Sequence, residues 1–230
     1  MCANPPVERT GSSRFRRRLF QPQWGLLPAA HRRRWANAVR TMKILVSPLS
    51  CAQSIVAMCA PERVVSLLDP EATFPDFGPA YGGRHLRLRL HDVHLPSAHE
   101  IGPTSAHVEQ LLAFFRLWRR SAPLLIHCRA GFGRSTAAAF VAMCFFSPEA
   151  DELALAKAFR AVAPHARPNE ALVRIADASM QRRGRMHAAI ADTGRGLSWP
   201  AMAEGVPFEL PEVCQSPNKA LHATAAAPGS

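Results

Sequence analysis

The chain has 230 residues, of which 48% are hydrophobic, so it can form one domain with a real core, and global disorder is excluded. Its formal net charge of +11 would suit nucleic acid or an acidic membrane. However, residues 1–41 hold nine arginines and one acidic residue, so this segment carries +8 of the +11. The longest apolar run, Ala137 to Phe146, is far shorter than the ~20 residues of a membrane helix.

Residues 1–41 lack a sustained helical or strand period, and we expect a basic, disordered extension. The stretch R-R-R-L-F-Q-P-Q-W resembles a twin-arginine export signal, but Pro22 and Pro28 interrupt its apolar core. A transit peptide and a start site placed too early are two further interpretations. Since no span or clear export signal is found, we expect a cytoplasmic protein. Few aromatic residues are interleaved for base stacking, so contact of this segment with nucleic acid or an acidic surface is not expected.

From residue 43 onward, strand and helix patterns alternate. In chain order we predict a strand at 43–46, a helix at 50–58, a strand at 63–68, a Pro- and Gly-rich loop at 70–83, a strand at 84–90, a helix starting at 103–105, a strand at 123–127, and helices at 135–146, 151–162 and 169–180, the last closed by Gly184. This order predicts an α/β fold with a largely parallel central sheet flanked by helices. Ligands of such folds bind beyond the carboxyl ends of the strands.

Two of these elements have a clear burial pattern. The strand at 84–90 alternates leucine with basic residues, which predicts one buried face and one solvent face. The helix after it has an apolar face, formed by Val108, Leu111, Leu112, Phe115 and Trp118. After residue 196 the sequence is rich in Pro, Ala and Gly, so we assign 42–196 to the folded domain and 197–230 to a mostly irregular, disordered tail.

The six cysteines are scattered without C-x-x-C pairs, so neither a zinc ribbon nor a disulfide framework is indicated. Cys51, Cys59 and Cys144 have apolar neighbours and are expected to be small core residues. Cys128 differs from them, because it ends an apolar strand and precedes a loop that contains two glycines.

The stretch L-L-I-H-C-R-A-G-F-G-R-S-T-A at 124–137 predicts a strand, a tight loop and the start of an apolar helix. In this geometry loop amides and the helix dipole converge on one anion. We expect phosphate there, bound by the loop residues Arg129, Ala130, Gly131, Phe132, Gly133 and Arg134. The same positive groups stabilise a thiolate, so Cys128 is the predicted nucleophile. His127 is expected to orient the loop, and the hydroxyl of Ser135 to assist the departing thiolate.

The segment His127–Ser135 matches H-C-x-x-G-x-x-R-S/T at every fixed position, and it resembles the signature of the cysteine-dependent protein tyrosine phosphatase superfamily. The resemblance covers about residues 42–190 and is to a small dual-specificity-like member. It implies a phosphoric monoester hydrolase that forms a phosphocysteine on Cys128 and uses Asp92, in H-D-V-H-L-P, as general acid. It also implies that Asn169 shapes the pocket or places the hydrolytic water, that no cofactor or metal is required, and that the partners are phosphorylated protein substrates.

Several alternatives stay open. Glu100 and Asp76 are rival acids to Asp92, and Asn169 can be a plain helix cap. Members that act on phosphoinositides tend to have extra lysines in the loop that follows the cysteine, and this chain has none there. Phosphoinositides and nucleotides remain alternative substrates. A non-catalytic phosphate-binding module is a further interpretation. A metal-dependent phosphohydrolase would use the cluster formed by His91, Asp92, His94 and His99, but no partner cluster is evident. The low-molecular-weight phosphatase class is disfavoured, because Ala57 stands six positions after Cys51.

Overall fold

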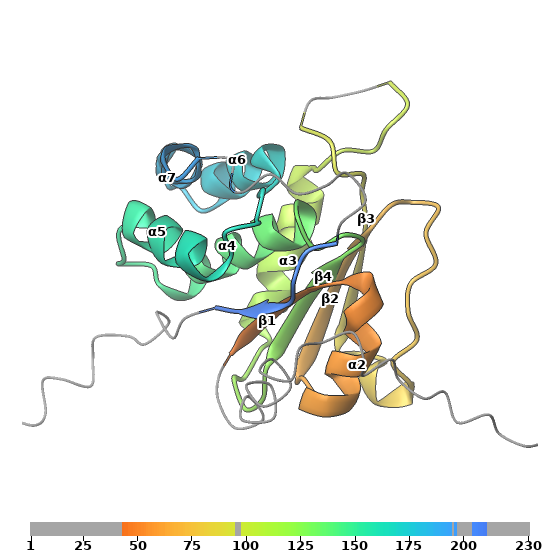
Figure 1. Cartoon of the computed structure of the whole chain (residues 1–230). Helices are drawn as coiled ribbons and strands as arrows, with labels where there is room; N and C mark the ends of the chain where they lie inside the picture. The colour runs from red at the N-terminus through yellow and green to blue at the C-terminus, as the bar shows by residue number, and fades with distance from the viewer. Residues whose placement is uncertain (1–42, 95–97, 195, 197–203, 211–230) are drawn as a thin grey trace, which may run out of the picture.

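The computed structural model describes residues 43–94, 98–194, 196 and 204–210. These residues form a five-stranded sheet with helices on both faces (Figure 1). The predictions for residues 1–41 and for most of the C-terminal tail lie outside the described residues. The division of the chain into domains at residues 41 and 196 stays a prediction.

The sheet has the order β3-β2-β4-β1-β5. Its strands are β1 (Ile44–Pro48), β2 (Arg63–Leu68), β3 (His85–Arg89), β4 (Leu124–Cys128) and β5 (Phe208–Glu209). The first four are parallel, and only β5 pairs antiparallel, with β1. The predicted α/β fold with a largely parallel sheet is therefore confirmed.

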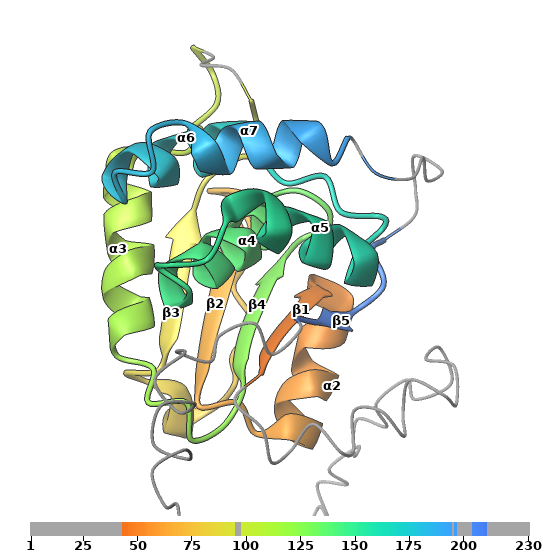
Figure 2. The ribbon, with the colours of Figure 1, turned by 90° about the vertical axis from the view of Figure 1, so that its left-hand side faces the viewer.

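The two faces of the sheet carry unequal layers (Figure 2). One face packs against α2 (Leu49–Cys59), with the short 3-10 turn η3 (Pro79–Tyr81) nearby. The other face carries the remaining helices, which are α3 (Ser105–Arg116), α4 (Arg134–Phe146), α5 (Glu152–Val162), α6 (Glu170–Ser179) and α7 (Arg185–Asp192). The larger hydrophobic cluster lies on this second side.

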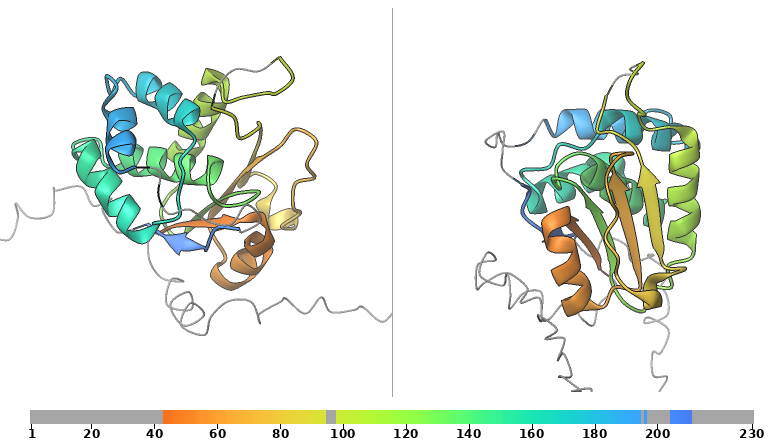
Figure 3. Two further views of the ribbon diagram at one scale, coloured as in Figure 1. Left: turned by 45° about the horizontal axis from the view of Figure 1, so that its top comes forward. Right: turned by 90° about the vertical axis from the view of Figure 1, so that its right-hand side faces the viewer.

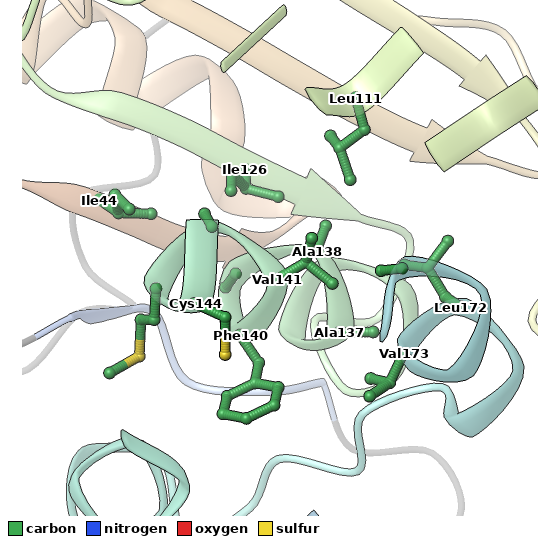
Figure 4. Packing of buried hydrophobic residues seen from close by; sticks show 14 of the residues in the cluster. Ile44, Leu111, Ile126, Ala137, Ala138, Phe140, Val141, Cys144, Leu172 and Val173 are labelled. Carbon is green, nitrogen blue, oxygen red and sulfur yellow. The ribbon is translucent and has the colours of Figure 1, made fainter. Parts of the chain in front are cut away.

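Helix α4 is the centre of that cluster (Figure 4). Its side chains from Arg134 to Cys144 are all buried, and three consecutive alanines, Ala137 to Ala139, let the helix lie close to the sheet. Ile44 and Ile126 from the sheet and Leu172 from α6 pack around it. Since α4 begins directly after the glycine-bearing loop, its tight packing fixes the position of that loop.

The predicted burial patterns hold in the structure. The side chains of Leu88 and Leu90 are buried and those of Arg87 and Arg89 are exposed, as the alternation predicted, whereas Leu86 on the apolar face is only partly buried. The predicted apolar residues Val108, Leu111, Leu112 and Phe115 of α3 are buried, and so is Trp118, which lies two residues beyond the end of the helix. Thr104 caps α3 through a capping box with His107. Cys59 and Cys144 are core residues, whereas Cys51 is only partly buried.

Two features differ from the predictions. Gly184 does not close α6; it is the left-handed N-cap residue of α7 (φ 84°), a helix that the sequence analysis missed. Helix α7 has no acidic residue in its first turn and no side-chain cap, so the usual start signals are absent. In addition, residues 204–210, assigned to the irregular tail, pack on the domain, and two of them, Phe208 and Glu209, form β5.

Within the described part of the chain, no helix combines the length and the apolar character needed to cross a membrane.

Candidate active site

The predicted site residues lie at the carboxyl ends of the parallel strands. Figures 2 and 3 show these strands ending on the same side of the sheet. Cys128 is the last residue of β4, Asp69 directly follows β2, and Asp92 lies three residues after the end of β3. Because parallel strands bring their carboxyl ends to the same edge, three segments far apart in sequence meet there.

Residues Cys128–Arg134, called here the phosphate loop, surround the sulfur of Cys128. The Sγ atom accepts a hydrogen bond from the backbone N–H of Gly131 at 3.2 Å and lies 3.1 Å from the Ser135 Oγ. Gly131 has a φ of +77°, and an added Cβ would meet the backbone nitrogen of Pro48 at 3.0 Å, so both conformation and space require glycine. The cysteine, the loop and the serine therefore come together as predicted.

The carbonyl groups of the phosphate loop point away from Cys128, toward the surrounding protein. Backbone amides from four sites donate to them: Leu49 to Arg129 at 3.0 Å, Gly205 to Ala130 at 2.7 Å, Arg167 to Phe132 at 2.9 Å and Asn169 to Gly133 at 3.2 Å. Thr136 Oγ1 also donates to the carbonyl of Gly133 at 2.8 Å and to that of Phe132. In a trans peptide the N–H points opposite to the C=O, so this arrangement turns loop amides inward.

Arg134 is almost completely buried, with 4% of its side chain exposed. Its Nη1 donates to Asp69 Oδ1 at 2.8 Å and to the carbonyl oxygen of Leu90 at 2.6 Å. Its Nε has no hydrogen-bond partner among the described residues and lies 4.0 Å from Asp92 Oδ2. One nitrogen of the guanidinium is thus held by the protein, and another keeps its donor for an anion, which is the arrangement that oxyanion binding requires.

The carboxylate of Asp92 lies directly against the phosphate loop, so close that a Cβ on Gly133 would collide with it. Asn169 Nδ2 donates to Asp92 Oδ1 at 2.8 Å and to the Val93 carbonyl at 3.0 Å. The same side chain is fully buried, and its Oδ1 accepts the N–H of Leu172 at 3.0 Å as the N-cap of α6. Asn169 therefore caps α6 and also holds the carboxylate of Asp92 by a hydrogen bond. Its part in placing water stays a prediction.

His127 is fully buried behind the nucleophile. Its Nε2 lies 2.5 Å from Ser66 Oγ, which in turn lies 2.7 Å from His85 Nε2. Burial is the main cause that lowers the pKa of His127 to about 3, with the nearby His85 acting in the same direction and the backbone of Cys128 opposing it. His127 is therefore neutral at physiological pH, and its contact with Ser66 links the end of β4 to β2. Its part in orienting the loop stays a prediction.

The rival acids lie in other surroundings. Asp76 accepts the N–H of Gly78 at 2.8 Å within its own turn, and it lines a separate cavity of about 660 Å³ beside β3. Glu100 is exposed. For the metal alternative, His91 Nδ1 accepts the Ile101 N–H at 2.9 Å, and the described residues contain no group of three His, Cys, Asp or Glu side chains that could hold a metal ion.

A cavity of about 540 Å³ lies beside the segments that carry Asp92 and Asn169. It is lined by His94, Arg167, Pro168, Glu170, Ile190, Ala191 and Gly194. His94 belongs to the segment that carries Asp92, and Pro168 precedes Asn169, so the cavity adjoins the residues that position the candidate acid.

Sequence reasoning missed four contributors to this geometry: Asp69, Ser66, Thr136 and Gly205. Two of them had a visible signal. Asp69 is an acidic residue directly after a buried strand, and Ser66 is the one polar residue among the five buried positions of β2. Thr136 lies in an apolar helix with no feature that reveals its contact, and Gly205 lies in a segment without any recognisable period.

No protein-family model matches the chain, and no curated protein matches it in sequence. Among solved structures, it is similar to the Yvh1 phosphatase domain from Chaetomium thermophilum, with 16% identity, a TM-score of 0.45, and coverage of 64% of this chain and 94% of that one. It is also similar to the human tyrosine phosphatase-like serine/threonine/tyrosine-interacting protein (14% identity, TM-score 0.49, 61% and 92% covered) and to human DUSP28 (19% identity, TM-score 0.45, 63% and 95% covered).

Proposed function

We propose that this chain is a cysteine-dependent phosphatase that hydrolyses phosphomonoesters through a phosphocysteine intermediate. The observation that carries the proposal is the position of the Cys128 sulfur. It lies at the N-terminal end of a buried helix, within hydrogen-bond distance of the Gly131 amide and the Ser135 hydroxyl. The buried guanidinium of Arg134 follows in the same loop and keeps Nε for a ligand.

In the first step the thiolate of Cys128 attacks phosphorus, so that an S–P bond forms while the P–O bond to the leaving group breaks. Loop amides and Arg134 carry the charge of the equatorial oxygens. Asp92 is protonated at the start and transfers its proton to the departing oxygen. Its contact with Gly133 and its hydrogen bond from Asn169 support this role, because they hold the carboxyl at the rim of the loop.

In the second step a water molecule attacks phosphorus and the S–P bond breaks. Asp92, now a carboxylate, accepts the proton of the water. The electron pair of the broken bond returns to Cys128, and the Ser135 hydroxyl, 3.1 Å from the sulfur, stabilises the thiolate by donating a hydrogen bond. The free enzyme and inorganic phosphate are then restored with all protons accounted for.

The substrate class that we propose is phosphoprotein, with phosphotyrosine alone or phosphotyrosine together with phosphoserine and phosphothreonine. The phosphate loop carries one exposed basic side chain, Arg129, and no lysine, which favours a singly phosphorylated group over a polyanionic headgroup. A panel of phosphopeptides, inositol phosphates and nucleotides tests this choice. Higher kcat/KM on inositol phosphates or nucleotides than on every phosphopeptide would contradict it.

The direct test of the mechanism is Cys128→Ser in the full chain, assayed on a small aryl phosphate. Turnover should be lost, because a serine hydroxyl is a far weaker nucleophile, while tungstate binding should remain, because the amides and Arg134 are unchanged. Retention of more than a few per cent of the activity would contradict the assignment. Tungstate binding by the wild type without any turnover would indicate a phosphate-binding module instead.

A further inference from the structure

Residues Glu204–Leu210, called here the C-terminal strap, are anchored firmly beside β1 (Figure 2). Leu210 N–H donates to the carbonyl of Ile44 at 2.9 Å, and Lys43 forms an ion pair with Glu209 at 3.2 Å. Phe208 and Leu210 are buried, and the ring of Phe208 packs edge-on against Phe159. Edge pairing and apolar burial together fix the end of the strap, residues 208–210, against the domain.

The start of the strap contacts the phosphate loop from behind. Glu204 contacts the Ser50 hydroxyl at the start of α2, and the N–H of Gly205 donates to the carbonyl of Ala130 at 2.7 Å. This is the shortest of the four backbone hydrogen bonds that hold the loop carbonyls outward. Gly205 is buried at this point, whereas its neighbour Val206 is 36% exposed.

The peptide group between Ala130 and Gly131 connects the strap to the sulfur. Its carbonyl accepts from Gly205, and its N–H donates to Cys128 Sγ at 3.2 Å. Because the peptide group is planar and trans, fixing the direction of the carbonyl also fixes the direction of the N–H. We propose that Gly205 is a positioning residue for the phosphatase reaction, which aims the Gly131 amide at the nucleophile. This inference rests on the proposed function.

The position requires a glycine because the two backbones approach closely. A Cβ on Gly205 would lie 2.9 Å from the carbonyl oxygen of Gly131 and 3.2 Å from that of Ala130. Both neighbours are backbone atoms, so they cannot move aside by a change of rotamer. Gly205→Ala must therefore push the strap and the loop apart, which lengthens the hydrogen bond and turns the peptide group.

The experiment compares Gly205→Ala with Val206→Ala in the full chain. For Gly205→Ala we expect kcat on an aryl phosphate to fall about 10- to 100-fold and inhibition by tungstate to weaken about tenfold, because a misdirected amide weakens oxyanion binding. The pH profile of Cys128 alkylation by iodoacetate should move to higher pH. Val206→Ala should leave all three unchanged. An unaltered tungstate affinity and alkylation profile in Gly205→Ala would overturn the proposal, whatever the melting temperature.

A measurement on the wild type avoids the risk that the variant fails to fold. Tungstate bound in the loop should slow hydrogen exchange of the 204–210 segment, because loop and strap are stabilised together. Exchange in this segment that does not respond to saturating tungstate would overturn the proposal. The two hypotheses fail separately. If the wild type shows no turnover but Gly205→Ala still weakens tungstate binding, the role of the strap is supported and the phosphatase is contradicted. If the wild type is active but Gly205→Ala binds tungstate as tightly as the wild type, the phosphatase is supported and the role of the strap is contradicted.

Discussion

The phosphate loop and the loop that carries Asp92, called here the acid loop (residues 91–94 and 98–102), meet at the site but are built differently. In the phosphate loop, Cys128, Gly131, Gly133 and Arg134 are buried, and backbone amides from four sites hold its carbonyls. The described part of the acid loop is mostly exposed and projects from the body of the domain in Figure 1. About a third of the Asp92 side chain is accessible to solvent.

The difference indicates how the nucleophile and the candidate acid are each held in position. The nucleophile and the anion site are shaped by many backbone contacts, so single side-chain changes around them should be tolerated unless they remove a group that touches phosphate. The acid is positioned by few contacts, chiefly one side chain, Asn169. Replacing that side chain should therefore affect proton transfer while leaving phosphate binding nearly intact.

The largest effect after loss of the nucleophile is expected for Arg134→Lys. A lysine has one nitrogen in place of a planar fork, so it cannot hold Asp69 and Leu90 on one nitrogen and present another to an oxyanion. We expect kcat/KM on an aryl phosphate to fall about 10²- to 10³-fold. Arg174→Lys, at an exposed position of α6, is the matched control and should stay within twofold. A similarly small loss in Arg134→Lys would contradict a preformed anion site.

Asp92→Asn, in the acid loop, should have the next largest effect. Turnover should fall about 10²-fold for phenyl phosphate, whose leaving group needs a proton, and much less for nitrophenyl phosphate. Binding of tungstate should hardly change. Glu100→Gln, in the same loop, is the control and should show no dependence on the leaving group. A uniform loss across leaving groups in Asp92→Asn would make this residue structural and leave the acid unassigned.

A smaller effect is expected for Asn169→Ala, which separates the two tasks of this side chain. Loss of the cap should lower stability by about 0.5–2 kcal/mol, and loss of the contact with Asp92 should lower turnover about tenfold on phenyl phosphate. Asp151→Ala is a matched control, because Asp151 caps α5 through the N–H of Ala154 at 2.8 Å, away from the site. It should lose comparable stability with unchanged turnover. Equal activity in the two variants would show that Asn169 is only a cap.

The smallest of the expected effects is on the pH dependence of stability, through His127. Its pKa is lowered to about 3 in the folded protein, so between pH ~6.5 and 3 the unfolded state binds a proton that the folded state excludes. This contribution is fully present above pH ~6.5 and is lost as the pH falls, by up to about 1.4 kcal/mol per pH unit. Denaturant unfolding at pH 7 and 5 measures it. In His127→Asn the slope should be shallower by up to one proton; an unchanged slope would contradict the neutral, buried histidine.

Much of this architecture could be predicted from sequence, for physical reasons that differ between elements. Strand β2 was predicted with its observed bounds, Arg63–Leu68, and helix α4 within one residue, because buried apolar runs between turn residues leave few alternatives. The phosphate loop was recognisable because its chemistry needs particular residue types at fixed spacing. Asp92 was identified only through the family resemblance, which implies an acid on a loop before the cysteine, and the structure places its carboxylate against the phosphate loop.

The parts that escaped prediction depend on contacts between segments far apart in sequence. The hydrogen bond from Arg134 to Asp69 joins residues 65 positions apart, and neither residue reveals its partner. The strap was assigned to the tail, because two strand residues have no period to recognise, and its place follows only from pairing with β1. Helix α7 is short and starts at a glycine, which in sequence looks like the end of the preceding helix.

The most direct test of the central claim is to identify the covalent intermediate. In Asp92→Asn the second step lacks its base, so reaction with nitrophenyl phosphate, followed by a rapid denaturing quench, should trap the phosphoenzyme. Peptide mass spectrometry should find one phosphoryl group, on the peptide that contains Cys128 and on its sulfur, and none in the Asp92→Asn/Cys128→Ser double variant. A phosphoryl group on another residue, or turnover by the single variant with no modified peptide under any quench time, would contradict the account.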